Sequence, residues 1–495
     1  MNNQVQLIAY VDRLSGGGFR DLQALLEGPF AGLFGGVHVL PFFLPINGAD
    51  AGFDPIDHTQ VDPQLGTWED VRKLALNTDL MADMIVNHVS SRSPQFLDFL
   101  RHGKASPYAP LFLTCGRVFP RGATEKDLLR IYRPRPGLPF TRMRASDGSE
   151  HLLWTTFTTE QIDIDVSSEE GKKHLEQILN QFQTAGIRSI RLDAVGYAIK
   201  KPGTSCFMIP ETFEFIGELR AKAQARGIEV LVELHTYYRE QIEIAKQVDR
   251  VYDFALPPLI LYTLYTRNTA RLKQWLGISP RNAITVLDTH DGIGVMDVGA
   301  DGKNPSESPG LLSSQEIDSL VETVHQRSNG ESRQATGAAA NNLDLYQVNC
   351  TFYDALGQRD HEYLIARALQ LFAPGVPQIY YVGLLAGVND MDLLHRTGVG
   401  RDINRHYYTA AEIESSFKRS VVTELMELIR FRNTHSAFAG DFHLLPCGDQ
   451  AIAIEWRNEM HWARLDADFK TMLGSIAHSF DNGERRIEIG AGKIR

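Results

Sequence analysis

Residues 189–233 read SIRLDAVGYAIKKPGTSCFMIPETFEFIGELRAKAQARGIEVLVE. A short β-branched run at 189–193 opens the stretch, an amphipathic segment at 213–226 follows, and a second apolar run begins at 229. Short apolar runs favour buried strands, and the amphipathic segment has the periodicity of a surface helix that ends at Gly227. The stretch therefore predicts one strand–helix–strand unit of a parallel sheet.

The same alternation extends over most of the chain. Helix signals between the strands include Thr67 and Asp70, spaced as in a capping box, Ser168 before a helix at 169–182, and a helix at 360–372. The apolar runs with strand character number eight, at residues 5–10, 36–41, 81–89, 189–193, 229–233, 251–255, 283–288 and 377–381. Eight strand–helix units predict an α/β fold, a closed (β/α)8 TIM barrel.

Two connections are much longer than the few residues that usually join a strand to a helix, and both are rich in loop-forming residues. After a last long helix at 420–434, the pattern changes at about residue 437 to alternating, strand-like segments. We therefore expect a barrel with two inserted, loop-rich subdomains and a small C-terminal β domain. The expected segments are 1–85, 168–292 and 357–436 for the barrel, 86–167 for subdomain B after strand three, 293–356 for the second insertion, and 437–495 for the β domain.

Composition narrows the class of protein. A chain of 495 residues with 43% hydrophobic and 22% charged residues resembles a folded, soluble enzyme. A net charge of −11 repels nucleic acid, so we expect no nucleic-acid partner. The four cysteines form no Cys-x-x-Cys pair, the N-terminus lacks signal-peptide features, and no apolar run is long enough to span a membrane. A cytoplasmic protein without a membrane association is expected.

Polar residues follow four of the predicted strands, where the loops of a barrel converge over one pocket. A charged residue after a strand often only marks its exit into solvent, but four such segments in order on one barrel favour an active site. Two carboxylates of unequal pKa are the groups that cleavage of a glycosidic bond requires. The segments are DMIVNH at 83–88, RLD at 191–193, Glu233, and DTHD at 288–291.

These four segments resemble the signature segments of the α-amylase clan of retaining α-glucosyl enzymes. Longer stretches are similar to the sucrose phosphorylases within that clan, and the similarity extends to about residue 435. They are LPFF at 40–43, GADAGFDPIDH at 48–58, IYRPRPGLPF at 131–140, RLDAVGY at 191–197, NLDLYQVN at 342–349 and RDINRHYY at 401–408.

The resemblance implies a reversible phosphorolysis of sucrose to α-D-glucose 1-phosphate and D-fructose, with retention through two successive displacements. By the same resemblance, Asp193 is the nucleophile that forms a β-glucosyl ester, and Glu233 is the general acid and then the base. Asp291 is expected to bind the glucose hydroxyls most strongly in the transition state. Arg191 is expected to keep Asp193 ionised, because a nearby cation lowers a carboxylate pKa.

The glucose pocket implied by the resemblance contains further polar and aromatic side chains. Phe53 and Tyr197 could instead be core residues, and His88 and His290 could be structural histidines with satisfied hydrogen bonds. The implied substrate-binding residues are Asp50, Phe53, His88, Gln161, Arg191, Tyr197, His290 and Arg401.

Phosphate is a dianion that must be held beside three carboxylates on an acidic protein, so local positive groups are needed. Arg133 and Arg135 lie in a proline-stiffened loop, and a guanidinium binds phosphate oxygens in pairs. These arginines could instead be solvated in a rigid surface turn. The resemblance implies a phosphate site of Arg135, His235 and Tyr346 and, with part of an acceptor loop in 293–356, a fructose site of Pro134, Leu343, Asp344 and Gln347.

Several alternatives stay open at this point. A related phosphorylase could release glycerol, glycerate or a phosphorylated fructose in place of fructose. A hydrolase could use water in place of phosphate. A catalytically inactive barrel could bind sugar without any reaction. We expect no required metal, because Asn87 alone is not a calcium site and Asp297 and Asp301 are irregularly spaced. No nucleotide cofactor is expected, since no glycine-rich phosphate loop follows a strand. The resemblance suggests a homodimer.

Overall fold

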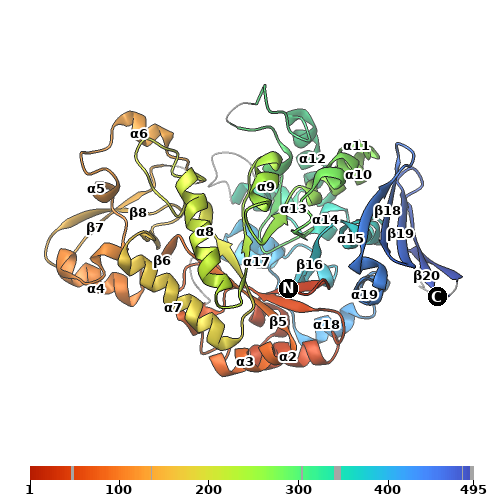
Figure 1. Ribbon diagram of the computed structural model, residues 1–495, viewed down its shortest axis with the longest axis horizontal. Helices are drawn as coiled ribbons and strands as arrows, with labels where there is room; N and C mark the ends of the chain where they lie inside the picture. Colours follow the sequence, from red (N-terminus) through yellow and green to blue (C-terminus); the bar gives the residue numbers. More distant parts are fainter. Residues whose placement is uncertain (46–49, 135–136, 303–304, 339–346, 482, 491–495) are drawn as a thin grey trace.

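The computed structural model describes residues 1–495 apart from 46–49, 135–136, 303–304, 339–346, 482 and 491–495 (Figure 1). Eight parallel strands form a closed barrel in the order β1-β16-β13-β12-β11-β10-β5-β2. The expected (β/α)8 barrel is confirmed, and each predicted run supplies one strand. Their bounds are β1 Gln6–Ala9, β2 Gly36–Val39, β5 Asp79–Ile85, β10 Ser189–Asp193, β11 Glu229–Val232, β12 Arg250–Asp253, β13 Ala283–Thr285 and β16 Val376–Tyr380.

The run at 81–89 differs from its prediction. The barrel strand β5 ends at Ile85, and His88–Ser90 forms a separate short strand, β6, which pairs antiparallel with β9 (Gln161–Asp163). Residues 86–90 are buried on both sides of this turn, so the apolar pattern continues although the chain changes direction.

Helices pack around the barrel. The predicted capping box at Thr67 and Asp70 begins α3, and Ser168 caps α7 by accepting a hydrogen bond from the Gly171 backbone N–H. The main barrel helices are α2 Phe19–Glu27, α3 Trp68–Asn77, α7 Glu169–Ala185, α8 Pro210–Gln224, α9 Tyr238–Ala245, α10 Leu256–Thr266, α11 Ala270–Ile278, α15 Asp360–Phe372 and α19 Ser420–Thr434.

The chain between β5 and α7 extends to one side of the barrel, drawn in orange in Figure 1. It carries its own small hydrophobic cluster, which includes Trp154, Phe119 and Ile131. Its elements are β6, β9, α4 Pro94–His102, α5 Cys115–Val118, α6 Glu125–Arg130, β7 Phe140–Arg144 and β8 Glu150–Trp154.

A second long connection follows β13. Its short strands β14 (Ile293–Gly294) and β15 (Gln347–Val348) pair antiparallel, so that Gly294 lies opposite Gln347. The helices α12 Ser314–Arg327, α13 Glu331–Ala338 and α14 Phe352–Ala355 belong to the same connection. The segment boundaries expected from the sequence stay predictions.

The C-terminal segment forms a five-stranded antiparallel sheet at the opposite side of the barrel, drawn in blue in Figure 1. It packs on the barrel through Trp456, whose indole N–H donates to the Phe372 carbonyl over 2.8 Å at the end of α15. The expected C-terminal β domain is therefore confirmed as a fold feature. Its strands are β17 Asp441–Leu445, β18 Ala451–Asn458, β19 His461–Asp468, β20 Leu473–Phe480 and β21 Gly483–Ile489.

Candidate active site

Three carboxylates meet at the carboxyl ends of the barrel strands. Asp193 is the last residue of β10, Glu233 directly follows β11, and Asp291 lies in the loop after β13. Their side chains are between 12% and 14% exposed, which means that each is largely enclosed yet still reaches solvent. The structure therefore brings the three predicted catalytic residues to the face where barrel active sites form.

The guanidinium of Arg191 joins two of these carboxylates. Arg191 is buried in the middle of β10, with its Nη1 3.2 Å from Asp193 Oδ1 and its Nη2 in contact with Glu233 Oε1. Asp83, on the neighbouring strand β5, contacts the same Nη1. Because β10 lies between β5 and β11, the strand register places all these side chains around one cation.

The direction of the Asp193 pKa shift differs from the expectation based on the ion pair alone. Burial raises the pKa of Asp193 well above its ordinary value, and the Glu233 and Asp83 carboxylates add to this shift, whereas Arg191 opposes it. Asp193 and Glu233 both contact Arg191, so one guanidinium faces the two carboxyl groups. A nucleophile and a general acid need one proton between them.

A buried polar layer supports Arg191 from below. His38 Nε2 lies 3.0 Å from Asp83 Oδ2, and the Tyr252 hydroxyl lies 3.4 Å from His38 Nδ1. Burial alone would raise the pKa of Asp83, but Arg191 and His38 hold it at about 2. The ionised Asp83 thus fixes the position of the guanidinium.

Asp291 lies beside two arginines and a histidine. Arg401 Nη1 is 2.9 Å and Arg405 Nη2 is 3.7 Å from Asp291 Oδ1, and His290 Nε2 is 3.7 Å from the same oxygen. Although burial alone would raise the pKa of Asp291, Arg401, His290 and Arg405 hold it well below the ordinary range. Arg401 also lies 3.9 Å from Asp50, so it connects the two carboxylates.

Phe53 and His290 form a stacked pair beside the carboxylates. Their ring centroids are 4.8 Å apart at an interplanar angle of 10°, and the Arg191 guanidinium lies 5.4 Å from the Phe53 ring. Phe53 is also part of the main hydrophobic cluster, so it contributes both to the core and to the wall of the site. Burial lowers the pKa of His290 to about 3.

His88 and Gln161 come from the paired strands β6 and β9. His88 Nε2 lies 2.8 Å from the Phe53 carbonyl oxygen and 3.2 Å from Gln161 Nε2, and burial lowers the pKa of His88. The contact to Phe53 fixes the His88 ring. The short β6–β9 sheet therefore attaches the inserted segment to the site.

Tyr197 is half-buried and lies in an aromatic cluster. Its ring is 5.1 Å from Phe157, 4.7 Å from Phe207 and 6.1 Å from Tyr132. Tyr197 ends the short 3-10 helix that follows Asp193, and its ring packs in this aromatic cluster.

The predicted phosphate and acceptor residues are described only in part. Arg135, Tyr346, Leu343 and Asp344 lie outside the described residues. Among the remaining three, Pro134 is half-buried, Gln347 is buried in β15, and the His235 ring stacks on Phe254 with centroids 4.0 Å apart. His235 Nδ1 is 3.0 Å from Asp297 Oδ2.

Asn87 has a partner other than a metal ion. The Asn87 Oδ1 atom accepts a hydrogen bond of 2.8 Å from Lys200 Nζ, which also lies 2.7 Å from Asp163 Oδ2 and contacts the Tyr197 carbonyl. The Lys200 and Asp163 side chains are almost completely buried. Within the described ranges, no group of three or more His, Cys, Asp and Glu side chains is placed to hold a metal ion.

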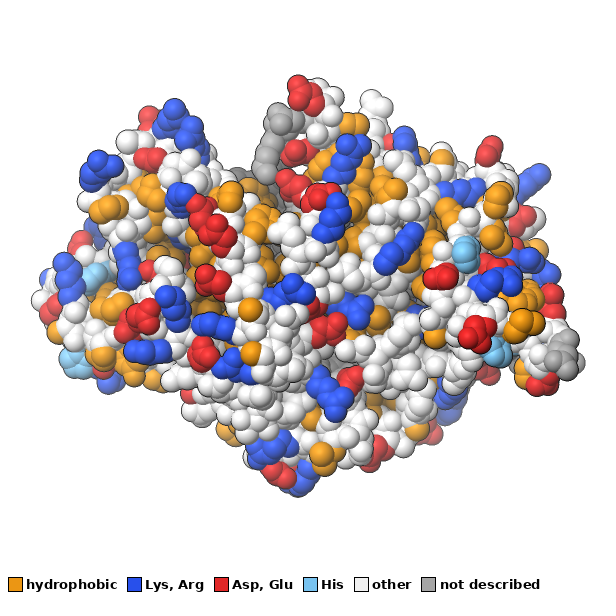
Figure 2. All heavy atoms as spheres, viewed as in Figure 1, with side chains coloured by type: hydrophobic (Ala, Val, Ile, Leu, Met, Phe, Trp, Pro, Cys, Tyr) orange, Lys and Arg blue, Asp and Glu red, His pale blue; other side chains and the backbone are white. Residues whose placement is uncertain are grey.

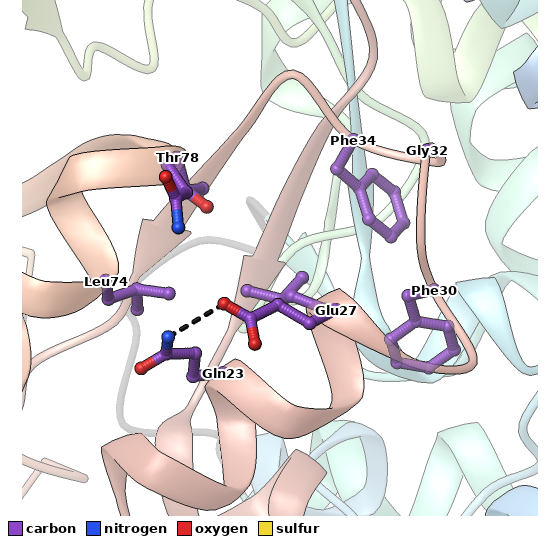
Figure 3. Close-up of a pocket in the computed structure, with 9 residues that line it drawn as sticks. Gln23, Glu27, Phe30, Gly32, Phe34, Leu74 and Thr78 are labelled. Carbon is purple, nitrogen blue, oxygen red and sulfur yellow. Dashed lines mark hydrogen bonds between the residues drawn. The ribbon is translucent and has the colours of Figure 1, made fainter.

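A pocket shown in Figure 3 lies at the other end of the barrel. It is formed by α2, α3 and the loops that lead into β2 and β5, and Gln23 Nε2 donates to Glu27 Oε1 over 2.8 Å inside it. These loops approach the amino ends of the strands, so the pocket does not belong to the carboxylate site.

The distribution of charged side chains on the surface agrees with the acidic net charge of the sequence. On the face shown in Figure 2, basic and acidic side chains are intermixed rather than gathered into one basic patch. None of the helices in the part of the chain that is described is both long and apolar enough to cross a membrane.

Sequence reasoning missed three residues that shape the site. Arg405, whose Nε donates to the His290 carbonyl over 2.8 Å, is completely buried beneath Asp291. Lys200 and Asp297 are the other two. Asp297 was interpreted only as part of an irregular acidic loop, and all three act on residues that are distant in sequence, so no local motif indicates them. A signal for Arg405 was available in the RDINRHYY stretch, whose second arginine was not assigned a role.

The closed barrel and the carboxylates at its carboxyl-terminal face define a (β/α)8 enzyme. A family model described as the α-amylase catalytic domain matches residues 34–270. The chain is 61% identical over 481 residues to a sucrose phosphorylase of Agrobacterium vitis, covering 97% of this chain and 98% of the relative. It is 53% identical over 474 residues to a sucrose phosphorylase of Bifidobacterium adolescentis, covering 96% and 94%.

A solved structure is similar over its full length. The crystal structure of sucrose 6F-phosphate phosphorylase from Thermoanaerobacter thermosaccharolyticum matches with a TM-score of 0.90 and 39% identity, covering 99% of this chain and 98% of that one. The chain belongs to the α-amylase family and, within it, to the sucrose phosphorylases and their relatives.

Proposed function

We propose that the protein is a sucrose phosphorylase, which converts sucrose and inorganic phosphate reversibly to α-D-glucose 1-phosphate and D-fructose. Support comes from the Arg191 guanidinium, which contacts Asp193 and Glu233 together and so holds a nucleophile and an acid on neighbouring strands. The high identity to sucrose phosphorylases supports the choice of substrate.

In the first displacement, an oxygen of Asp193 attacks C1 of the glucosyl unit, and the C1–O bond to fructose breaks. Glu233 donates its proton to the departing fructosyl oxygen. Arg191 compensates the charge of the ionised partner in each state of the pair, because it contacts both carboxylates. The product of this step is a β-glucosyl ester of Asp193.

In the second displacement, a phosphate oxygen attacks C1 from the opposite face, and the ester bond to Asp193 breaks. Glu233 accepts a proton as the acceptor bond forms, which restores the starting state. Two inversions give an α product. Asp291, kept ionised by the Arg401 and Arg405 guanidiniums, stabilises the positive charge that develops on the sugar ring in both steps.

The glucose unit is proposed to lie against the Phe53–His290 pair. Asp50 and Arg401 are expected to bind the far hydroxyls, while His88, Gln161 and Tyr197 complete the wall. Neutral imidazoles suit this role, because burial lowers the pKa of both His88 and His290. Phosphate is assigned to Arg135, His235 and Tyr346, and fructose to Pro134, Leu343, Asp344 and Gln347.

The identity of the leaving group distinguishes sucrose phosphorolysis from the activities of related phosphorylases. The similar solved structure is that of a sucrose 6F-phosphate phosphorylase, so a phosphorylated fructose is the second candidate. The reverse reaction distinguishes them: the protein is incubated with α-glucose 1-phosphate and, in separate tubes, fructose, fructose 6-phosphate, glycerol or glycerate. We expect phosphate release fastest with fructose. Preference for another acceptor would keep the chemistry and change the substrate.

Two further parts of the proposal rest on the resemblance. A homodimer is testable by light scattering at several protein concentrations, and a cytoplasmic location is testable by fractionation of the producing cells. A mass of one chain at all concentrations would remove the dimer from the proposal.

A further inference from the structure

Asp297 is a completely buried carboxylate outside the three catalytic candidates, and its hydrogen bonds converge on the strand end that carries His235. It lies in a short 3-10 helix after β14. Its oxygens accept from the Thr236 backbone N–H over 3.2 Å and from Gln241 Nε2 over 2.7 Å, and Oδ2 lies 3.0 Å from His235 Nδ1. The carboxylate is thus held from three directions, one of which is the imidazole.

The His235 ring is fixed on both sides. Its plane stacks on Phe254 at an interplanar angle of 15° with centroids 4.0 Å apart, which leaves little freedom of rotation. On another side it meets the backbone of Gly294, where an added Cβ would lie 2.8 Å from Asp297 Oδ2 and 3.5 Å from His235 Nδ1. The pair therefore occupies the space that the missing side chain of Gly294 leaves.

This packing connects the pair to the expected acceptor loop. Gly294 is in β14, which pairs with β15, and its partner in the register is Gln347. Gln347 is one of the predicted acceptor residues, and it directly follows the stretch outside the described residues. His235 itself follows Glu233 by two positions, so the pair lies near the end of β11 that carries the acid/base candidate.

The bond to Asp297 determines what His235 can offer a ligand. Because Nδ1 contacts a carboxylate, it carries a proton, and a ligand can then only be met by Nε2. In a neutral ring Nε2 is an acceptor, which repels a phosphate oxygen, whereas in the imidazolium it is a donor.

Three carboxylates in the described structure act on the charge of His235. Asp297 comes from the 3-10 helix, Glu233 from the end of β11 and Asp291 from the loop after β13. Burial alone would lower the pKa of His235, but these three, with Asp297 first, raise it above its ordinary value. The surroundings thus favour the imidazolium.

We propose that Asp297 is a positioning residue for the phosphate step: it fixes the His235 ring and its charged form, so that Nε2 donates to a phosphate oxygen during attack on the glucosyl ester. This inference rests on the proposed phosphorolysis and adds a residue that the resemblance did not assign. No covalent bond is made or broken at either residue.

The test compares Asp297→Asn with the parent protein and with a control, Glu240→Gln. Glu240 is a carboxylate of the neighbouring helix α9 that contacts Thr236 Oγ1, so it controls for loss of a nearby negative charge. For each protein, release of glucose 1-phosphate is measured against phosphate and sucrose concentration, and release of glucose is measured without phosphate.

For Asp297→Asn we expect the KM for phosphate to rise about 10-fold or more, as expected for loss of a charge-assisted hydrogen bond. The kcat/KM for sucrose and the rate of glucose release without phosphate should stay within about 2-fold, since the glucosyl ester forms before phosphate reacts. The alkaline limb of kcat/KM for phosphate should move to lower pH, because the imidazolium is lost earlier. The ionisation of phosphate affects the parent and the variant equally, so it does not contribute to the difference between their pH profiles.

Equal losses with phosphate and sucrose, or an unchanged alkaline limb, would overturn the assignment, because a purely structural role produces those results. If the parent protein makes no glucose 1-phosphate from sucrose, the proposed function itself fails, and this outcome is visible before any variant is made.

A second variant covers the case in which Asp297→Asn does not fold. Gly294→Ala keeps the carboxylate and places a methyl group against the pair, so it should raise the KM for phosphate while the kcat/KM for sucrose stays near that of the parent. An unchanged KM for phosphate in Gly294→Ala would contradict the proposal.

Discussion

Arg401 Nη1 lies 2.9 Å from Asp291 Oδ1, and this contact joins the loop after β13 to a 3-10 helix at residues 400–404. Together with His290 and Arg405 it keeps the Asp291 pKa below its ordinary value of 3.8 despite burial. A carboxylate with a depressed pKa stabilises the folded state above the unfolded-state pKa, and this contribution is lost as the pH falls towards the folded-state value.

Asp291→Asn should therefore be less stable than the parent at neutral pH, and the difference in Tm should shrink as the pH falls below about 4. The same variant should lose about 100-fold or more in kcat/KM for sucrose, as for removal of one transition-state contact. Asp318→Asn, at an exposed position of α12, is the matched control and should show neither effect. A Tm difference that does not depend on pH would contradict the charge assignment.

The covalent role of Asp193 is testable by trapping. Glu233→Gln, incubated with α-glucosyl fluoride and no phosphate, should accumulate a glucosyl ester, because fluoride leaves without an acid and water attacks the ester poorly without a base. Peptide mass spectrometry after an acid quench should find one added hexosyl residue on the peptide that contains Asp193. Addition of phosphate should release it as α-glucose 1-phosphate.

Asp193→Ala should abolish phosphorolysis and hydrolysis together. Substantial turnover of sucrose by this variant, or a label on a peptide without residue 193, would rule out Asp193 as the nucleophile.

The buried Lys200–Asp163 contact of 2.7 Å predicts a stability effect. Lys200→Met leaves a buried carboxylate without its cation, and the free energy of unfolding should fall by about 3–5 kcal/mol. Lys201→Met is a matched control, since the next lysine is about half exposed and its contact to Glu211 is at the surface. The control should change stability by less than about 1 kcal/mol. Denaturant titration of the three proteins measures both values, and similar losses in the two variants would contradict the prediction.

The proposed phosphate site suggests a matched pair of arginines, Arg135 and Arg133. Arg135→Ala should raise the KM for phosphate by about 10-fold or more with a much smaller effect on sucrose, because a bidentate guanidinium contact is lost. Arg133→Ala is the comparison, since Arg133 donates to the Gly137 carbonyl over 3.0 Å, and its effect on the KM for phosphate should be smaller than that of Arg135→Ala. Steady-state kinetics with each substrate varied in turn decides the point. Equal effects of Arg135→Ala on both substrates would remove its assigned role.

The barrel could be predicted from the sequence because its strands are short apolar runs separated by helices with clear start signals. Thr67 and Ser168 illustrate this, since each caps the helix that the local pattern predicted. The run at 81–89 was wrong at its end for a physical reason. The chain turns after Ile85 into another buried strand, so burial continues while the direction changes, and periodicity does not record direction.

The candidate catalytic residues were predictable because each stands at or just after a strand end, where barrel topology alone brings side chains together. The contacts that determine the charge of these residues could not be predicted from the sequence. Arg405 reaches His290 across 115 positions, and Asp297 reaches His235 across 62. Such pairs form where a long loop folds back onto the barrel, and the local spacing of residues does not predict the path of that loop. The net direction of the Asp193 pKa was missed for a related reason, because burial outweighs the ion pair.

The most direct measurement of the central claim follows sucrose with and without inorganic phosphate, with α-glucose 1-phosphate, glucose and fructose assayed in the same samples. We predict that phosphate yields α-glucose 1-phosphate in an amount equal to fructose, with the α configuration verified by NMR of the first product formed. Glucose equal to fructose, at a rate that does not depend on phosphate, would show a hydrolase and contradict the account.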